Sequence, residues 1–498
     1  MTMLQELFSV GVLIPWLLSM VFGIFVGAVP GLTATMAVAL IVPISYYMEN
    51  ANAGLAMIIG VTFTAIFAGD IPATFLKIPG TPASAAATLD GYPLTRKGKG
   101  GLALTLDLFC SCIGGLIGVG LLIFLSPQLA RIAIKFSSFE YFWLAIFGLT
   151  MSAAVSSGTL VRGLTAAAFG MLLSTVGIDI VSGSSRYTFG NVEMMSGLQF
   201  IPVMIGLFGL AEVLRNLRVK EAMDVPTLSG DTGFAAWAAA KILFQHKWTV
   251  LKSSFLGTLV GALPGAGADI AAWAAYGIAK KTSKNPDEFG MGAVEGIVAP
   301  TSANNAALGG AWIPALVFGI PGDAVTAIVL GAMMVYEIKP GPFIFENSPD
   351  QVRAIFTIAL MTQVFLLFAG FLGIKAFSRI LRLPRSIIMT GVVLFSVVGS
   401  YSLRNSMFDV YVMLTFGVVG FFMDSHKVPP APLILGLILG PMVEEKYRIG
   451  LIKSGGNILP FFNRPICMLL IFLLFLTFFG NPIYKWVRER KVSSMPDA

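Results

Sequence analysis

Long apolar runs, separated by short polar breaks, make up most of the chain. Residues 101–126, 354–377 and 464–480 each meet or approach the roughly 20 residues that an α-helix needs to cross a bilayer. Counting interrupted runs, the pattern indicates about ten to twelve such segments. The run at 8–29 lacks a basic flank and a small-residue cleavage site, so we expect it to stay in the membrane. We therefore predict an all-α polytopic membrane protein.

A helix-breaking motif occurs twice in the chain. Residues 23–34 read GIFVGAVPGLTA and residues 257–268 read GTLVGALPGAGA, which match at seven of twelve positions. A second pair, IPATFLKIPGTPASA at 71–85 and IPALVFGIPGDAVTA at 313–327, matches at seven of fifteen positions. The offsets are 234 and 242 residues, and the polar stretch at 280–288 accounts for the difference. Two echoes in the same order predict two related halves.

Basic residues assign the polar breaks to a side of the membrane, because Lys and Arg gather on the cytoplasmic side. They predict an N-terminal half at 1–214, a cytoplasmic linker at 215–248, a C-terminal half at 249–480 and a basic cytoplasmic tail at 481–498. The flanks of the first Pro-Gly motif carry no Lys or Arg, whereas the flanks of the second are basic. We therefore expect the two motifs to enter the membrane from opposite faces, as in inverted-topology repeats.

Each Pro-Gly motif is either the tip of a re-entrant hairpin or a break in a full-length helix. The second echo adds a crossing to each half, broken by Pro72 and Pro79 or by Pro314 and Pro321. Unpaired backbone groups are costly in lipid, so broken helices survive where protein or a polar cavity covers them. Four breaks in two matched pairs predict a substrate and ion site. The alternative is that Pro and Gly only kink the helices and allow close packing.

The candidate site residues belong to the two tips, the two broken crossings and the polar stretch TSANN at 301–305. Free N–H groups at helix N-termini suit carboxylates, and hydroxyl, amide and carbonyl oxygens suit cations. The candidates are Pro30, Gly31, Thr33, Thr35, Gly69, Asp70, Pro79, Gly80, Thr81, Pro264, Gly265, Gly267, Asp269, Ser302, Asn304, Asn305, Pro321, Gly322 and Asp323.

Charged residues inside apolar segments need their own interpretation. Asp70, Asp269 and Asp323 are candidates for cation or proton coupling, because intramembrane carboxylates are rare and usually functional. A structural ion pair or a helix cap fits each of them almost as well. Lys77 either pairs with a substrate carboxylate or extends toward the basic face.

Composition narrows the class of protein. Of the 498 residues, 56% are hydrophobic and 12% are charged, where a soluble domain has roughly 25% charged residues. The net charge of +7 comes from Lys and Arg in short loops, which favours membrane anchoring over nucleic-acid binding. Three Cys in apolar runs and two His without a metal-binding spacing argue against a disulfide framework and a metal site. No cofactor is expected, and no motif of a membrane-embedded enzyme is present.

Four longer stretches resemble a known family. GAVPGLTATMAVALIVP, IPGTPASAAATLDGYPLTRKGKGGLAL, GALPGAGADIAAW and APTSANNAALGGAWIPALVFGIPG together resemble the large membrane subunit of tripartite tricarboxylate transporters, the TctA family. The resemblance implies a multi-pass subunit of the bacterial inner membrane that imports carboxylates by symport with Na⁺ or H⁺. It also implies a small membrane subunit of about four spans, a periplasmic substrate-binding protein and an elevator-type movement.

The chain departs from the usual pattern of this family at three places. It has Phe67-Ala68-Gly69-Asp70 where Tyr-Gly-Gly-Ser is usual, Asp269 where Thr is usual, and Thr301 where Glu is usual. A fixed negative charge beside an anionic substrate needs a cation or a proton to neutralise it. We therefore expect the substrate or the coupling ion to differ from the citrate type. A partner-independent secondary transporter and a channel for a small organic solute remain as alternatives.

Overall fold

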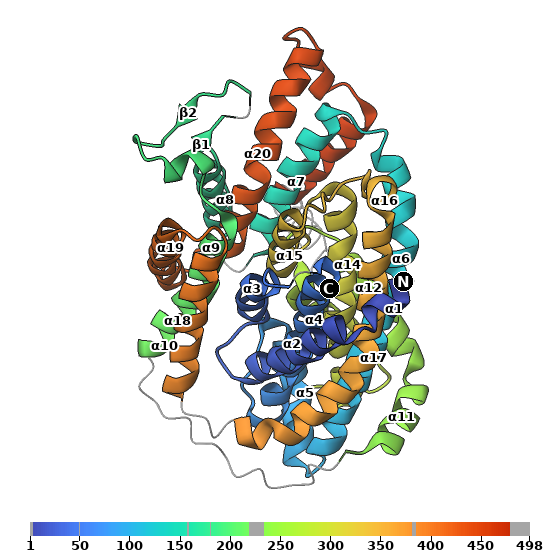
Figure 1. Ribbon diagram of the computed structural model, residues 1–498. Helices are drawn as coiled ribbons and strands as arrows, with labels where there is room; N and C mark the ends of the chain where they lie inside the picture. Colours follow the sequence, from blue (N-terminus) through green and yellow to red (C-terminus); the bar gives the residue numbers. More distant parts are fainter. Residues whose placement is uncertain are drawn as a thin grey trace, which may run out of the picture.

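The computed structural model describes residues 3–478, except 49, 157–158, 180, 219–233 and 381–384. These residues form a bundle of α-helices with one short antiparallel pair of strands, β1 (Gly177–Ile178) and β2 (Ser185–Arg186) (Figure 1). Seven of the described helices are long and apolar enough to cross a membrane, and five shorter apolar helices accompany them. The prediction of an all-α polytopic membrane protein is confirmed.

The helices follow one another with short connections. The first part of the chain forms α1 (Met3–Leu7), α2 (Val10–Ala28), α3 (Ala34–Ser45), α4 (Ala51–Leu76), η1 (Pro82–Ser84), α5 (Ala85–Arg96), α6 (Gly100–Ala133), α7 (Ser138–Val155), α8 (Leu160–Ser174), η2 (Glu193–Ser196), α9 (Phe200–Met204), the π-helical η3 (Ile205–Leu210) and α10 (Ala211–Arg218). The second part forms α11 (Ala236–Gln245), α12 (Lys247–Gly261), α13 (Gly267–Thr282), η4 (Pro286–Glu288), α14 (Glu295–Phe318), α15 (Ala324–Val335), α16 (Ile344–Asn347), α17 (Pro349–Ile380), α18 (Arg385–Ser402), α19 (Met407–Ser425), α20 (Pro430–Lys453), η5 (Leu459–Phe461) and a helix at Pro465–Phe478.

The two parts repeat one order of elements. Helices α2, α3, α4, α5 and α6 correspond in order to α12, α13, α14, α15 and α17. In each part, two helices joined by a Pro-Gly turn pack along one long helix, α4 or α14. These two helices are buried over almost their whole length, so their Pro and polar residues are covered by protein. Broken helices need such cover within a membrane.

The repeat extends to individual contacts. A methyl group on Gly27 would lie 2.3 Å from the Ala65 carbonyl oxygen, and one on Gly261 would lie 2.1 Å from the Ala307 carbonyl oxygen. Gly261 follows Gly27 by 234 residues and Ala307 follows Ala65 by 242, which are the offsets of the two sequence echoes. Small residues of this kind let membrane helices approach closely. The shared packing supports the prediction of two related halves.

The two broken crossings also have the same backbone course. Helix α4 ends at Lys77 and α14 ends at Gly319, both in the left-handed conformation, with φ of 60° and 69°. A left-handed residue is a common way to end a helix. Thr81 and Asp323, four residues further on, each form a capping box with the residue three positions later. Each crossing is therefore a long helix, a sharp turn and a newly capped helical segment.

Each Pro-Gly motif forms the tip of a helical hairpin. Gly31 and Gly265 take left-handed φ values of 93° and 84° at the two turns. Both arms of each hairpin pack against the same long helix, since α2 and α3 contact α4 while α12 and α13 contact α14. With 19 residues, α2 is by itself long enough to cross a membrane. Insertion of the two hairpins from opposite faces stays a prediction.

The expected linker at 215–248 is mostly helical where the structure describes it. Helix α10 ends at Arg218, and α11 followed by the start of α12 covers 236–248. Leu243 of α11 packs with Leu106 of α6 in a small apolar cluster. Helix α11 is thus attached to the bundle. Residues 219–233 and the tail at 481–498 lie outside the described residues, and the four region boundaries stay predictions.

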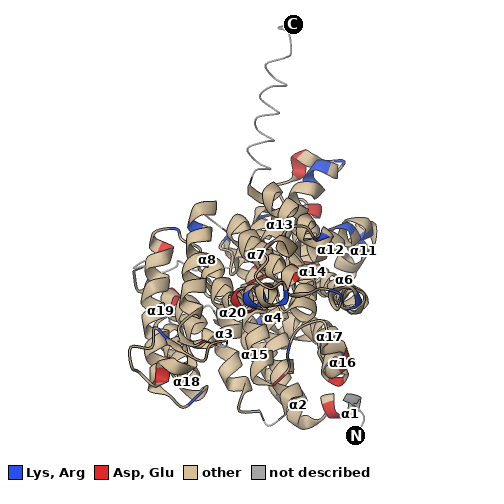
Figure 2. Ribbon diagram, turned by 90° about the horizontal axis from the view of Figure 1, so that it is seen from above, with Lys and Arg blue, Asp and Glu red and all other residues tan. Residues whose placement is uncertain are grey.

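Charged side chains are sparse over the bundle (Figure 2), and two ion pairs tether the loop around β1 and β2 to α20. Arg448 Nη1 lies 2.9 Å from Asp179 Oδ2, and Arg186 Nη1 lies 2.7 Å from Glu444 Oε1. The Val181 N–H, the Ser182 hydroxyl and Arg448 together hold the pKa of Asp179 well below its ordinary value. The Asp179 carboxylate therefore stabilises this loop.

We expect this tether to survive moderate acid. Because the pKa of Asp179 is lower in the folded protein, its stabilising contribution is full above the ordinary pKa of 3.8 and is lost as pH falls through the lower folded value. Amide hydrogen exchange of residues 177–199, corrected for intrinsic rates, should stay constant from neutral pH to about pH 4 and rise below it. In Arg448→Ala the same amides should exchange faster at neutral pH. Opening of the wild-type loop well above the ordinary pKa of Asp would contradict this assignment.

Candidate functional site

A cavity with about 470 Å³ of free space lies where the two hairpin tips and the two broken crossings meet. The first half lines it with residues 33–35 after the first tip, Ile66 of α4, Thr81 and Pro82. The second half lines it with residues 265–270, Trp273 and 323–325. Residues outside the repeated elements complete the wall: Val155, Ser156, Phe208 and 429–431. Both halves therefore contribute to one cavity.

Three helices begin at the wall of this cavity. Thr33 caps α3 by accepting a hydrogen bond from the Met36 N–H at 3.2 Å. Asp323 caps α15 by accepting one from the Thr326 N–H at 2.7 Å. Helix α13 begins at Gly267, whose φ of 61° favours glycine. The first turn of a helix carries free N–H groups and partial positive charge, so this wall can bind an anionic oxygen without Lys or Arg.

The charge of the cavity wall comes from two carboxylates. Asp269 and Asp323 line it, and no Lys or Arg of the described chain does. Asp269 lies in the first turn of α13 with open side-chain surface, whereas Asp323 is partly buried and bonded to Thr326. Because both carboxylates line the same cavity, their negative charges repel each other. A carboxylate ligand would add to this repulsion, so a cation or a proton has to share the cavity with it.

The structure separates the predicted site residues into those of the cavity wall, those of the backbone around it and those of the core. Seven line the cavity: Thr33, Thr35, Thr81, Gly265, Gly267, Asp269 and Asp323. Eight form the tips and crossings without lining it: Pro30, Gly31, Gly69, Pro79, Gly80, Pro264, Pro321 and Gly322. In this second group, the Gly80 N–H donates to the Gly69 carbonyl oxygen at 3.0 Å. In the other half, the Gly265 N–H donates to the Gly322 carbonyl oxygen at 2.7 Å, so hydrogen bonds fix both crossings.

The remaining four predicted residues lie apart from the cavity. Asp70, Ser302, Asn304 and Asn305 are fully buried in the core, where α4, α6 and α14 pack together. The Asn304 side-chain amide donates to Asp70 Oδ2 at 3.2 Å. Ser302 Oγ and both polar side-chain atoms of Asn305 have no hydrogen-bond partner. The structure thus divides the predicted site into an open cavity and a closed polar cluster.

Lys77 lies outside both places. Its side chain is exposed, and its ammonium group lies over the ring of Tyr92, 5.7 Å from the ring centroid. The sequence allows two interpretations of Lys77, as a partner of a substrate carboxylate or as a side chain that extends toward the basic face. In the structure it lies away from the cavity. The left-handed φ of Lys77 gives it a backbone role at the end of α4.

Sequence reasoning missed several residues of the wall. Phe208, Trp273 and Ser156 lie in apolar helices or at their ends, where one aromatic or hydroxyl side chain carries no distinctive signal. Pro430 starts α20 beside the cavity, and the run VPPAP at 428–432 could have indicated a helix beginning there. Asp107, an acidic residue within α6, was recognisable as unusual but was not chosen.

The chain is similar to known proteins over most of its length. A sequence model of the family described as "Tripartite tricarboxylate transporter TctA family" matches residues 13–435. The chain is 34% identical over 449 residues, 90% of its length, to the "Uncharacterized 52.8 kDa protein in TAR-I ttuC' 3'region" of Agrobacterium vitis, and covers 89% of that protein. Over 215 residues, 43% of its length, it is 37% identical to the "Uncharacterized protein in TAR-II ttuC' 3'region" of Agrobacterium vitis, covering 89% of it. No solved structure matches the chain.

Proposed function

Because the chain belongs to the tripartite tricarboxylate transporter TctA family, whose model matches residues 13–435, we propose that it is the large membrane subunit of a carboxylate importer. In this proposal it is a binding-protein-dependent secondary transporter of the bacterial inner membrane. It carries a di- or tricarboxylate, or a related organic acid, together with Na⁺ or H⁺. Its partners are a small membrane subunit of about four spans and a periplasmic substrate-binding protein.

The observation that carries this proposal is the cavity between the two hairpin tips. Helices α3, α13 and α15 begin at its wall, which gives a carboxylate free N–H groups and partial positive charge. Asp269 and Asp323 give a cation two carboxylates in the same cavity. An anion and a cation bound side by side neutralise each other, which favours binding of both together. This is the arrangement that symport requires.

The repeat supports a mechanism of alternating access. In our proposal the two hairpins enter from opposite membrane faces, and their tips form the two sides of the cavity. The bond of Gly265 to Gly322 joins the second tip to its crossing, and the bond of Gly80 to Gly69 holds the first crossing in the turn that packs against Gly27 of the first hairpin. In our proposal tips and crossings therefore form one body. That body moves as a unit against the other helices and opens the cavity to one face at a time, as in elevator-type transporters.

The proposal is tested by uptake into proteoliposomes that contain this chain and its small membrane subunit. Radiolabelled citrate and a panel of dicarboxylates are offered with and without the binding protein, while the Na⁺ and pH gradients are varied separately. We expect uptake that depends on one of the gradients and on the binding protein. Uptake without the binding protein would support the partner-independent alternative. Uptake that ignores both gradients would support a channel and overturn the symport.

Asp269→Asn tests the place of the cation. The substitution keeps the shape of the side chain but removes its charge, so the cation loses one carboxylate. We expect the half-saturating concentration of the coupling cation to rise at least about tenfold, equal to about 1.4 kcal/mol. Asp350→Asn, at an exposed position on α17, is the matched control and should leave it unchanged. An unchanged cation dependence in Asp269→Asn would remove Asp269 from the cation site.

Lys77→Gly tests whether Lys77 contacts the substrate. A non-glycine residue in the left-handed conformation costs roughly 1 kcal/mol, so glycine should leave the free energy of unfolding unchanged or raise it by about that amount. Gly319 already fills the equivalent position in the other half. We expect carboxylate uptake to be retained, measured beside thermal unfolding of the same samples. Loss of uptake at unchanged stability would assign Lys77 to the substrate.

A further inference from the structure

Asp70 of α4 and Asp107 of α6 form a buried pair of carboxyl groups outside the cavity. Their residues are 0% and 1% exposed, and the two carboxyl groups are near neighbours where α4 packs on α6. Two negative charges at that separation would repel strongly in surroundings of low dielectric constant. The pair therefore needs a positive charge between its oxygens or beside them.

The surroundings supply almost no hydrogen-bond donors to this pair. Asn304 donates to Asp70 Oδ2 at 3.2 Å, whereas Asp70 Oδ1 and both oxygens of Asp107 accept no hydrogen bond from any other group. Asp90 shows the contrast. Its buried carboxylate accepts from the Tyr276 hydroxyl and from three backbone N–H groups, all at 2.8 to 2.9 Å. The chain therefore surrounds one buried carboxylate with donors and leaves the Asp70–Asp107 pair nearly without them.

Unpartnered neutral side chains complete the surroundings of the pair. Asn304, which contacts Asp70 through its amide nitrogen, keeps its Oδ1 atom unpartnered, and the residue is fully buried. Ser302 Oγ, also fully buried, is likewise without a partner. A polar cluster with unpartnered acceptors gains hydrogen bonds from a proton.

No basic side chain among the described residues balances the pair. The two carboxyl groups act on each other, and the Asp107 carboxyl group also acts on the Cys110 and Cys112 thiols of α6. Helices α2, α3 and α15, which also pack on α4, carry no titratable side chain. Several charged groups of the other neighbouring helices have partners elsewhere: Asp90 of α5 with Tyr276, Glu295 of α14 with His246, Asp350 with Arg353 of α17, and Lys375 of α17 with the Phe371 ring. The other basic side chains described on helices that pack on α4 or α6 are exposed: Arg96, Arg131, Lys241, Lys247 and Lys252.

We propose that Asp70 and Asp107 hold one proton between them and that this proton is carried with the substrate, in addition to the cation of the cavity. The use of the proton rests on the proposed function, whereas its presence rests on the buried pair alone. A shared proton converts the repulsion between the carboxyl groups into a hydrogen bond.

The Asp70–Asp107 pair is connected to the cavity through the first crossing. Gly69, next to Asp70, accepts the hydrogen bond of the Gly80 N–H, and a methyl group on Gly69 would lie 2.6 Å from Thr81 Oγ1. Thr81 lines the cavity. Loss of the proton restores the repulsion between α4 and α6 and displaces the part of α4 that supports Thr81. Proton binding and substrate binding are therefore coupled through the first crossing.

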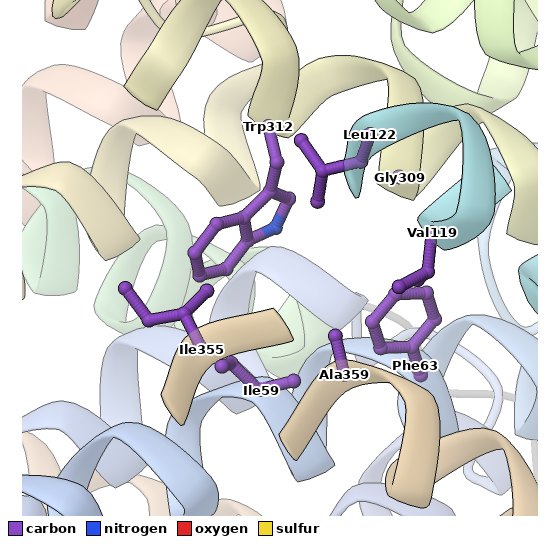
Figure 3. A pocket seen from close by; sticks show the side chains of 8 residues that line it. All are labelled: Ile59, Phe63, Val119, Leu122, Gly309, Trp312, Ile355 and Ala359. Carbon is purple, nitrogen blue, oxygen red and sulfur yellow. The ribbon is translucent and has the colours of Figure 1, made fainter. Parts of the chain in front are cut away.

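The described part of the chain carries this pair in one half only. Trp312 occupies the position of Asp70 at the repeat offset of 242 residues. It borders a narrow apolar pocket among α4, α6, α14 and α17, where no lining side chain is charged (Figure 3). The side chains that line it are those of Ile59, Phe63, Val119, Leu122, Trp312, Ile355 and Ala359, with Gly309. We therefore expect one shared proton for each chain.

Infrared spectroscopy of the full chain in lipid tests whether the proton is present. We expect a carboxylic-acid C=O band at neutral pH that shifts in D₂O, is lost in Asp70→Asn and in Asp107→Asn, and persists in Asp350→Asn. In Asn304→Ala both carboxyl groups remain but the one donor is lost, so the band should persist to higher pH than in the wild type. If the Asp70→Asn or Asp107→Asn variant fails to fold, Asn304→Ala still tests whether the proton is present. The shared proton is refuted if the wild-type spectrum lacks this C=O band. It is also refuted if the band changes with NaCl concentration and not with pH.

Transport measurements test what the proton is used for. We expect Asp70→Asn to lose at least about tenfold of the uptake of labelled carboxylate driven by a pH gradient and to retain exchange of carboxylate without a gradient. If Asp70 had only a structural role, gradient-driven uptake and exchange would fall together. That result would overturn the proposal that the proton is carried with the substrate. A wild-type chain that shows the infrared band but imports none of the offered carboxylates would refute the proposed function and leave the acid pair as a proton site.

Discussion

Gly80→Ala and Gly322→Ala should each reduce carboxylate uptake by about 100-fold, because a binding group displaced by about 1 Å commonly loses that factor. A methyl group on Gly80 would lie 2.4 Å from the Gly27 carbonyl oxygen, and one on Gly322 would lie 2.6 Å from the Gly261 carbonyl oxygen. Both obstacles are backbone atoms, which cannot rotate away as a side chain can. The crossing has to separate from the hairpin, and Thr81 or Asp323 then leaves its place in the cavity wall.

The matched control for these substitutions is Gly277→Ala. Gly277 lies in α13, and a methyl group there would meet nothing within 4 Å. Alanine in a helix interior is favoured over glycine by up to about 1 kcal/mol, so uptake and thermal stability should be unchanged or slightly higher. Uptake is measured per molecule of folded protein, which separates loss of function from loss of protein. Gly80→Ala with normal uptake would show that the first crossing tolerates separation from its hairpin.

The repeat could be predicted from the sequence because its matching positions are mostly Gly, Ala and Pro, which permit close backbone contact or break helices. Gly and Pro break helices, and Gly also lets two helices pack closely. Two halves with the same helix packing therefore keep the same residues at the same spacing. The offsets of 234 and 242 residues therefore hold for single contacts, such as those of Gly27 with Ala65 and of Gly261 with Ala307. Hairpin tips and broken crossings followed from this pattern.

The division between cavity and core could not be predicted in the same way. Helices α4 and α14 are apolar and buried on all sides, so periodicity does not show which face a polar residue occupies. Asn304 and Thr81 both appear as polar residues in apolar surroundings, yet one lies in the core and the other lines the cavity. Asp107 was missed as the partner of Asp70 because α6 contacts α4 only through the tertiary fold.

Contacts between the two halves were also beyond the sequence. Asp90 of α5, in the first half, binds a segment of the second half. Its Oδ1 atom accepts hydrogen bonds from the N–H groups of Gly290, Gly292 and Ala293, each at 2.8 Å. Its Oδ2 atom accepts one from the Tyr276 hydroxyl at 2.9 Å. One side chain of the first half thus organises the connection between α13 and α14 in the second.

Asp90→Ala should therefore lower the free energy of unfolding by about 3–5 kcal/mol, as expected when one partner of a buried charged network is removed. The residue is 0% exposed, so the substitution leaves the buried Ala293 N–H and Tyr276 hydroxyl, and the less buried N–H groups of Gly290 and Gly292, without their acceptor. Chemical denaturation in detergent micelles measures the loss, and Asp350→Ala on the exposed end of α17 is the control, with an expected change below about 0.5 kcal/mol. Hydrogen exchange should rise first at residues 289–294, since that connection loses its anchor. A variant as stable as the wild type would mean that water replaces the carboxylate, and the connection would then owe its shape to its glycines alone.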